Sequence, residues 1–100
     1  MNYKMIAIDL DNTLLTSEKK VDRETADLIK KADTAGKKVV LATGRMFEAA
    51  VPFLEELELD TPLITYNGAL VKDVNRKVIQ KSLISEDLTK EIIKLVVALF

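Results

Sequence analysis

The chain has 100 residues, enough for one domain and too few for two of ordinary size. Its 15 basic and 16 acidic residues leave a formal net charge of −1, which argues against a nucleic-acid wrapper or a polybasic membrane binder. The sequence contains no Cys and no His, so disulfides, thiolate nucleophiles, thiolate metal sites and imidazole catalysis are excluded. Any chemistry therefore uses carboxylates, hydroxyls, amides, Lys or Arg, and a bound metal would be a hard, oxygen-liganded cation.

The first third of the chain predicts a strand, a loop and a helix. Residues 5–10 form a nearly unbroken apolar run, which is typical of a strand covered on both faces in a parallel sheet. Residues 11–20 are polar and predict a loop. A helix capped by Asp22 is expected to run to about residue 35, and Gly36 suits a left-handed C-terminal cap. Its buried stripe would contain Ala26, Ile29 and Ala32, with Leu28 as a further candidate.

The middle of the chain predicts two more strands with a helix between them. Residues 39–42 predict a second buried strand, and residues 63–66 predict a third. A helix should cover much of 46–58, either beginning near Pro52 or bending there, because proline suits a first turn and kinks an interior.

The last third predicts a hairpin and a final helix. Residues 70–72 and 77–80 are short strand candidates on either side of a polar turn at 73–76. Ser85 suits the N-cap of a helix that runs toward Phe100, with acidic residues in its first turn. The order strand–helix–strand–helix–strand indicates a doubly wound α/β fold built on a Rossmann-like parallel sheet.

The three core strands end in polar, turn-forming clusters. These clusters are Asp9 to Thr13, Thr43-Gly44-Arg45 and Asn67-Gly68. Ligands in open α/β sheets bind outside the carboxyl ends of the strands, so the spacing alone predicts one site at this rim. Thr43 and Gly44 offer a hydroxyl and an unobstructed amide just before a helix, a position that favours anions.

Asp9 and Asp11 are the candidate chemical groups. Alternate residues of an extended chain point to the same side, so the two carboxylates should converge and repel each other unless a cation joins them. Mg²⁺ is the expected cation, because it prefers carboxylate and carbonyl oxygens. One carboxylate can attack phosphorus, and the second can protonate the departing alkoxide and later deprotonate water.

Each of these features also has a simpler interpretation. Paired Asp residues at a strand end are usually solvated turn formers, and Thr43-Gly44-Arg45 alone could be a plain strand exit. Asn67-Gly68 is often only a hairpin turn. Arg45 could equally be a surface or ion-pairing residue as a substrate contact.

Three motifs carry a resemblance to a known family. Residues 6–15 read IAIDLDNTLL and resemble the first motif of the haloacid dehalogenase-like (HAD) phosphohydrolases. Thr43-Gly44-Arg45 resembles their second motif. Tyr66-Asn67-Gly68-Ala69 resembles a turn of the Cof-type subgroup, after which a cap domain is inserted. The order and spacing of the motifs fit, and the resemblance covers nearly the whole chain.

The resemblance implies a role for each site residue. Asp9 would be the nucleophile and a magnesium ligand, and Asp11 the general acid/base, whose backbone carbonyl also binds the metal. Thr43 would hold the transferring phosphoryl group with help from the Gly44 amide. Arg45 and Asn67 would lie near the substrate. Asn12 occupies a position often taken by Gly.

The family pattern also needs a Lys and a later acidic motif, both of which normally follow the cap. The sequence offers no Lys that suits this role, so we expect the chain to be the amino-terminal part of a longer enzyme. Residues 1–82 would belong to the core, hairpin included, and 83–100 would begin an α+β cap. The strand at 5–10 would then become an exposed apolar edge, which invites the rest of the enzyme or a second copy to pair with it.

The sequence thus predicts a magnesium-dependent phosphatase that acts on small phosphorylated metabolites through an aspartyl-phosphate. The alternative is a module that binds phosphate or Mg²⁺, or accepts a phosphoryl group, without turnover. No nucleic-acid or membrane partner is expected. The absence of a targeting or bilayer-spanning pattern predicts a cytoplasmic protein.

Overall fold

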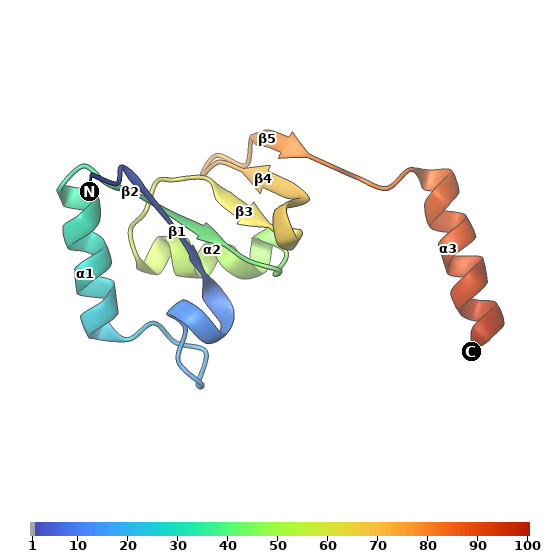
Figure 1. Cartoon of the computed structure of the whole chain (residues 1–100), viewed down its shortest axis with the longest axis horizontal. Coiled ribbons are helices and arrows are strands. Elements are labelled where there is room, and N and C mark those ends of the chain that lie inside the picture. Colours follow the sequence, from blue (N-terminus) through green and yellow to red (C-terminus); the bar gives the residue numbers. More distant parts are fainter. Residues whose placement is uncertain (1) are drawn as a thin grey trace.

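Three parallel strands and an antiparallel hairpin form one mixed sheet in the computed structural model, which describes residues 2–100 (Figure 1). The sheet order is the chain order, β1 to β5. The strands are β1 (Met5–Asp9), β2 (Lys38–Ala42), β3 (Leu63–Thr65), β4 (Leu70–Lys72) and β5 (Val78–Lys81). β1, β2 and β3 run parallel, and β4 and β5 fold back as the predicted hairpin. The α/β fold class expected from the sequence is confirmed.

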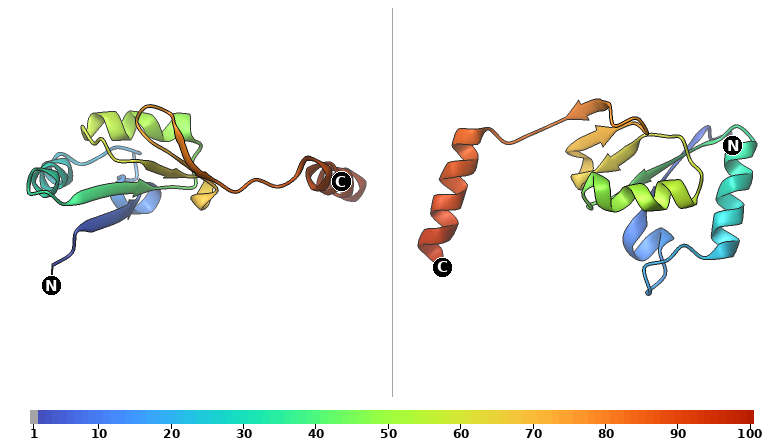
Figure 2. Two further views of the ribbon diagram at one scale, coloured as in Figure 1. Left: turned by 90° about the horizontal axis from the view of Figure 1, so that it is seen from above. Right: turned by 180° about the vertical axis from the view of Figure 1, so that it is seen from behind.

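Two helices, α1 (Arg23–Thr34) and α2 (Phe47–Glu56), cover one face of the parallel strands (Figure 2). The core between them and the sheet is apolar, and Val39, Leu41 and Leu63 supply its strand side. Residues alternate between the two faces of a strand, so these side chains point to the helices while Asp9, Ala42 and Ile64 belong to the other face. Those last three residues are register partners and form one row across the sheet.

β1 is an edge strand, and neither face of it is fully covered. Met5 is 61% exposed and Ile6 is 42% exposed, although the sequence of this strand is the apolar run expected of a fully covered one. On its helix side, an apolar groove of about 290 Å³ separates Ile6 and Ile8 from α1. Leu28, a candidate for the buried stripe of α1, is 59% exposed at this groove. The stripe itself consists of Ile29, with Ala26 and Ala32 partly buried beside it.

Two short helical turns follow strands where the sequence predicted loops. η1 (Leu10–Leu14) is a wide turn closed by the Leu15 N–H donating to the Leu10 carbonyl over 2.9 Å. Within it Asn12 has a left-handed φ of 64°, a conformation that Asn adopts more readily than most residues. η2 (Tyr66–Gly68) follows β3 and also contains left-handed residues. Leu14 and Leu15 are buried, so η1 is anchored in the core.

The expected helix termini are found, with differences in detail. Asp22 stands at the N-cap of α1, but its side chain makes no capping hydrogen bond; Gly36 has the predicted left-handed φ, at 87°. Pro52 lies inside α2 rather than at its start. Its ring is exposed, so the carbonyl that loses an intrahelical partner can be hydrated.

The final helix, α3 (Glu86–Leu99), stands apart from the sheet at the end of an extended segment (Figures 1 and 2). Ser85 caps it as predicted, its Oγ accepting from the Leu88 N–H at 3.2 Å. The apolar stripe of the helix is exposed rather than packed: Leu95 is 62% exposed. Among residues 2–100, no helix is both long enough and apolar enough to cross a membrane.

Candidate functional site

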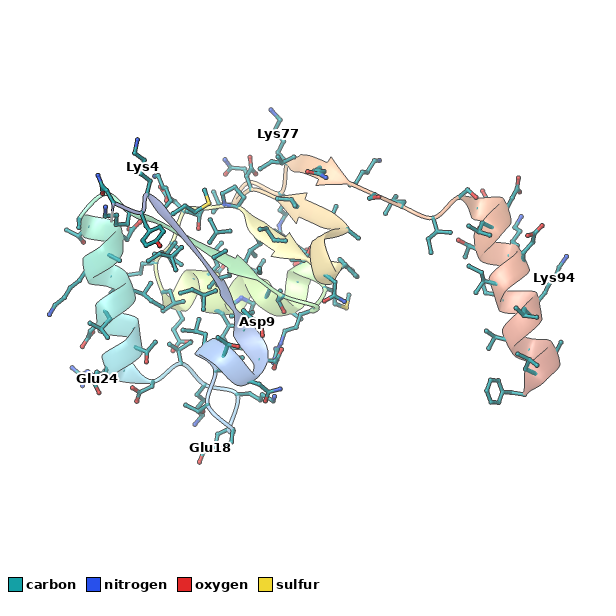
Figure 3. The ribbon with its side chains drawn as sticks, viewed as in Figure 1. Lys4, Asp9, Glu18, Glu24, Lys77 and Lys94 are labelled. Atoms are coloured by element: carbon teal, nitrogen blue, oxygen red, sulfur yellow. The ribbon has the colours of Figure 1, made fainter. Side chains whose placement is uncertain are left out.

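An open pocket of about 320 Å³ lies where the three parallel strands end. Asp9 comes from the end of β1, Ala42 with Thr43 and Gly44 from the end of β2, and Asn67 with Gly68 from η2. Figure 3 shows Asp9 at the point where β1 runs into η1. The predicted rim site therefore brings Asp9, Thr43, Gly44 and Asn67 together, on the sheet face away from α1 and α2.

Asp9 is exposed in this pocket and has one side-chain hydrogen bond: the Thr13 hydroxyl donates to its Oδ2 over 3.3 Å. The remaining carboxylate surface faces the pocket and solvent. Thr13 belongs to the first motif, but its position in the sequence predicted no separate role for it. An accessible, ionisable carboxylate held at a strand end can act as a nucleophile or a cation ligand.

The segment after β2 is tied to η2 by backbone hydrogen bonds. The Asn67 N–H donates to the Thr43 carbonyl, and the Tyr66 N–H donates to the Arg45 carbonyl, each over 3.0 Å. The buried Thr43 hydroxyl accepts from the Arg45 N–H, also at 3.0 Å. These bonds fix the backbone of the two loops that form most of the pocket.

The backbone at Gly44 has no room for a side chain, because the Asn67 side chain occupies the space beside it. A Cβ built on Gly44 would lie 2.8 Å from the Asn67 Oδ1 atom, closer than real contacts allow. The absence of that Cβ lets the amide side chain of Asn67 pack directly on the backbone of the loop. The two residues, expected separately at the rim, are thus in contact.

Asp11 has different neighbours from Asp9. Its carboxylate accepts two hydrogen bonds from Arg45, from Nε to Oδ2 at 2.8 Å and from Nη2 to Oδ1 at 2.9 Å. Lys19 Nζ lies 3.2 Å from Oδ1. The bonds from Arg45, then those from Lys19, hold the pKa of Asp11 well below its usual range, and the same contact raises the pKa of Arg45. Asp11 and Arg45 both lie outside the residues that line the pocket.

The two carboxylates that the sequence predicts to converge on one cation have different surroundings in the structure. β1 ends at Asp9 and η1 begins at Leu10. Within η1, Asp11 is again extended, with φ −67° and ψ 130°, and Asn12 is left-handed. Asp9 faces the pocket, whereas Asp11 faces Arg45 and Lys19. Nothing in the sequence pattern pointed to Lys19, which reads as part of a solvated pair, or to Phe53, whose ring centroid is 5.0 Å from the Arg45 guanidinium carbon.

The acidic side chain that lines the pocket fits Mg²⁺ in kind. It is the exposed Asp9 carboxylate, an oxygen ligand of the type that Mg²⁺ prefers. Within residues 2–100, however, no three acidic side chains are close enough together to form a metal site.

Comparison with known proteins identifies the family. A family model described as haloacid dehalogenase-like hydrolase matches residues 6–99. The chain belongs to this family. Its Cof-like motifs, mixed sheet and rim pocket are therefore those of a HAD-like protein.

The relatives are phosphatases by name. The chain is 36% identical over 87 residues to 5-amino-6-(5-phospho-D-ribitylamino)uracil phosphatase YcsE of Bacillus subtilis, covering 87% of this chain and 35% of that protein. It is 38% identical over 79 residues to pyridoxal phosphate phosphatase YbhA of Escherichia coli, covering 79% and 29%. Among solved structures, the HAD phosphatase BT1666 of Bacteroides thetaiotaomicron matches with a TM-score of 0.86 at 30% identity, covering 97% of this chain and 36% of that one. The chain thus spans about a third of the length of these relatives.

Proposed function

We propose that this HAD-like protein is a magnesium-dependent phosphatase of small phosphorylated metabolites. The observation that carries the proposal is the pocket in which Asp9 meets Thr43, Gly44 and Asn67. It combines a free carboxylate with a hydroxyl and a backbone that a phosphate can approach closely. Family membership and the named activities of the relatives support the same reaction.

In the proposed first step, an Asp9 carboxylate oxygen attacks the phosphorus of the substrate. The new bond joins that oxygen to phosphorus, the phosphorus–oxygen ester bond breaks, and the departing alkoxide takes a proton from the Asp11 carboxyl. In the second step, water attacks the aspartyl-phosphate. The water oxygen bonds to phosphorus while Asp11 accepts the proton of this water. The bond between phosphorus and the Asp9 oxygen breaks, inorganic phosphate departs, and Asp9 returns to its free carboxylate.

The environment of Asp11 keeps its side chain ionised. Arg45 and Lys19 hold its pKa below the usual range, so it is present in the carboxylate form that the second step needs, but as a weaker base than an ordinary Asp. To donate a proton in the first step, it must first gain one against this influence. Leaving groups that depart without protonation, such as nitrophenolate, avoid that requirement.

Mg²⁺, when bound, would offset the repulsion between the Asp9 carboxylate and the substrate phosphate. The Asp9 carboxylate and the Asp11 carbonyl are the oxygens of this chain that we propose to hold it. Thr43 and the Gly44 amide would hold the phosphoryl group. Asn67 on η2 and Arg45 in the loop after β2 lie next to these two residues.

The named activities of the relatives support a small phosphorylated molecule as the substrate class. YcsE and YbhA carry the names of enzymes for two different phosphorylated small molecules, so the shared element is the phosphate group. We propose that residues 1–82 form the catalytic core with its hairpin and that 83–100 begin a cap that selects the rest of the substrate. A cytoplasmic location suits such substrates and stays a prediction.

The open edge of the sheet at β1 is also a proposed contact surface. β1 has no neighbour on its outer side among the described residues, and the groove beside α1 is apolar. We propose that this edge receives either further sequence of the same enzyme or a second copy of the chain. An exposed, apolar edge strand otherwise invites uncontrolled pairing.

The test is a phosphatase assay with p-nitrophenyl phosphate and Mg²⁺. We expect at most weak turnover by the unchanged chain, its loss in Asp9→Asn and its retention in Asp27→Asn, a matched change at an exposed position of α1. Turnover that survives Asp9→Asn would contradict the proposal. Activity that appears only when a longer carboxyl-terminal segment is supplied would locate the missing groups there.

A second function has one observation in its favour. No three acidic side chains of residues 2–100 form a group that could hold a metal ion, and without a metal Asp9 could be phosphorylated without efficient hydrolysis. The protein would then be a phospho-acceptor or a phosphate-binding module. A stable phosphoryl group on Asp9, formed from a small donor in the absence of turnover, would favour this alternative.

A further inference from the structure

We propose that Arg45 is a positioning residue, which holds the Asp11 carboxylate beside the pocket and does not bind the substrate phosphate. The inference rests on the proposed function, because it assumes that Thr43 and Gly44 receive the phosphate. It also decides between the two interpretations of Arg45 that the sequence leaves open, a substrate contact or an ion-pairing residue.

The backbone of Arg45 is fixed on both sides. Its N–H donates to the buried Thr43 hydroxyl, and its carbonyl accepts from Tyr66 of η2. The side chain therefore leaves the loop from a set point. The side chain is 27% exposed, so most of its surface lies against protein.

The guanidinium is engaged with Asp11 and Phe53. The Nε and Nη2 donors pair with the two oxygens of one carboxylate, a bidentate geometry that is stronger and more directional than a single ion pair. The Phe53 ring of α2 lies beneath the planar group at 5.0 Å. To turn toward the pocket, the Arg45 side chain would have to break its ion pair with Asp11 and leave the Phe53 ring.

Lys19 completes the arrangement from another part of the chain. Its Nζ lies 3.2 Å from the Asp11 Oδ1 atom that Arg45 Nη2 also contacts. Asp11 is thus held from the loop after β2, from the segment between η1 and α1, and indirectly from α2. Only Thr43 and Gly44 of the second motif line the pocket; Arg45 does not.

NMR of the uniformly ¹⁵N-labelled full chain tests this inference. We expect a distinct, slowly exchanging Arg45 Nε–H resonance that is lost in Asp11→Ala. Titration with inorganic phosphate in the presence of Mg²⁺ should shift the Gly44 amide and leave the Arg45 Nε–H in place. The apparent phosphate affinity of Arg45→Gln should stay within about twofold of the unchanged chain, whereas loss of a direct charged hydrogen bond would weaken it by about tenfold or more.

Arg76→Gln is the matched control, because Arg76 also pairs with a carboxylate, that of Glu48, and lies over a Phe47 ring, but away from the pocket. It should leave both the Arg45 resonance and the phosphate affinity unchanged. An Arg45 Nε–H that ignores Asp11→Ala, or that moves with phosphate as Gly44 does, would overturn the inference. If Gly44 ignores phosphate, the proposed function fails, while the dependence of Arg45 on Asp11 still decides this inference.

Discussion

Asn67 and Gly44 show how one contact at the residue scale shapes the pocket. The Asn67 Oδ1 atom occupies the space that a Gly44 side chain would need. Asn67 itself has a left-handed φ of 55°, and its N–H donates to the Thr43 carbonyl. The position of its side chain thus depends on both loops.

Gly44→Ala should displace the Asn67 side chain and weaken phosphate binding severalfold. The new Cβ would lie 2.8 Å from Asn67 Oδ1, and a flexible amide can move away, so we expect the free energy of unfolding to change by less than about 1 kcal/mol. Phosphate titration and thermal melting measure the two effects. In an Asn67→Ala background the added methyl group should cost no further affinity; an equal loss in both backgrounds would show that the contact is irrelevant.

The second residue-scale prediction concerns the pH dependence of Asp11. Its folded-state pKa lies below the usual 3.8, because of Arg45 first and Lys19 second. A carboxyl with a depressed pKa stabilises the fold above its unfolded-state pKa, and this stability is lost as the pH falls through the lower folded-state value. The contribution should therefore persist at neutral pH and decline only below about pH 4.

Carboxyl ¹³C NMR measures this directly. Asp11 should remain ionised at a pH where an ordinary Asp is half protonated, and Arg45→Gln should raise its pKa toward the usual value. Lys19→Gln should raise it less, because Lys19 is the weaker cause. An unchanged titration in Arg45→Gln would mean that the ion pair does not form in solution.

At the scale of elements, the sequence predicted the frame of the site more fully than its contacts. Apolar runs placed β1, β2 and β3 within about a residue of their observed bounds, because buried strands leave a strong local pattern. Local pattern says nothing about a partner 34 residues away, so the pairing of Arg45 with Asp11 remained one of two interpretations. The wide turn η1 was also missed, because polar residues in its middle hide the buried Leu14 at its end.

α3 offers a test of what its cap contributes in the absence of packing. No α3 side chain belongs to the core cluster, and Ser85 provides the capping hydrogen bond at its start. Ser85→Ala should therefore lower the helicity of 86–99, at a cost of about 1 kcal/mol to the helix, and leave the melting temperature of the sheet unchanged. Backbone chemical shifts report the first effect and near-ultraviolet circular dichroism the second. A matching loss of sheet stability would indicate that α3 packs on the core.

At the scale of the whole molecule, one face of the sheet and one edge are open. α1 and α2 cover the same face, so Met5 and the rest of the outer row of β1 are left to solvent (Figure 2). The pocket lies on this open face, which means that water reaches it freely unless another segment closes over it. We therefore expect residues 1–100 alone to turn over substrate slowly.

The open edge predicts self-association of the isolated chain. Sedimentation velocity at rising concentration should show dimers or larger species, and Met5→Lys should reduce them, because a charge on an edge strand opposes pairing. Val97→Lys, at an exposed apolar position of α3, is the comparison variant. If Val97→Lys dissolves the assemblies and Met5→Lys does not, then α3 is the contact surface and β1 is not.

The central claim is that Asp9 receives a phosphoryl group in the pocket beside Thr43 and Gly44. Mass spectrometry after brief incubation with acetyl phosphate and Mg²⁺ tests it most directly. We predict one phosphoryl group on the peptide that contains Asp9, released by hydroxylamine as an acyl phosphate should be and absent in Asp9→Asn. A phosphoryl group on another residue, or none under conditions that keep the chain folded, would contradict the claim.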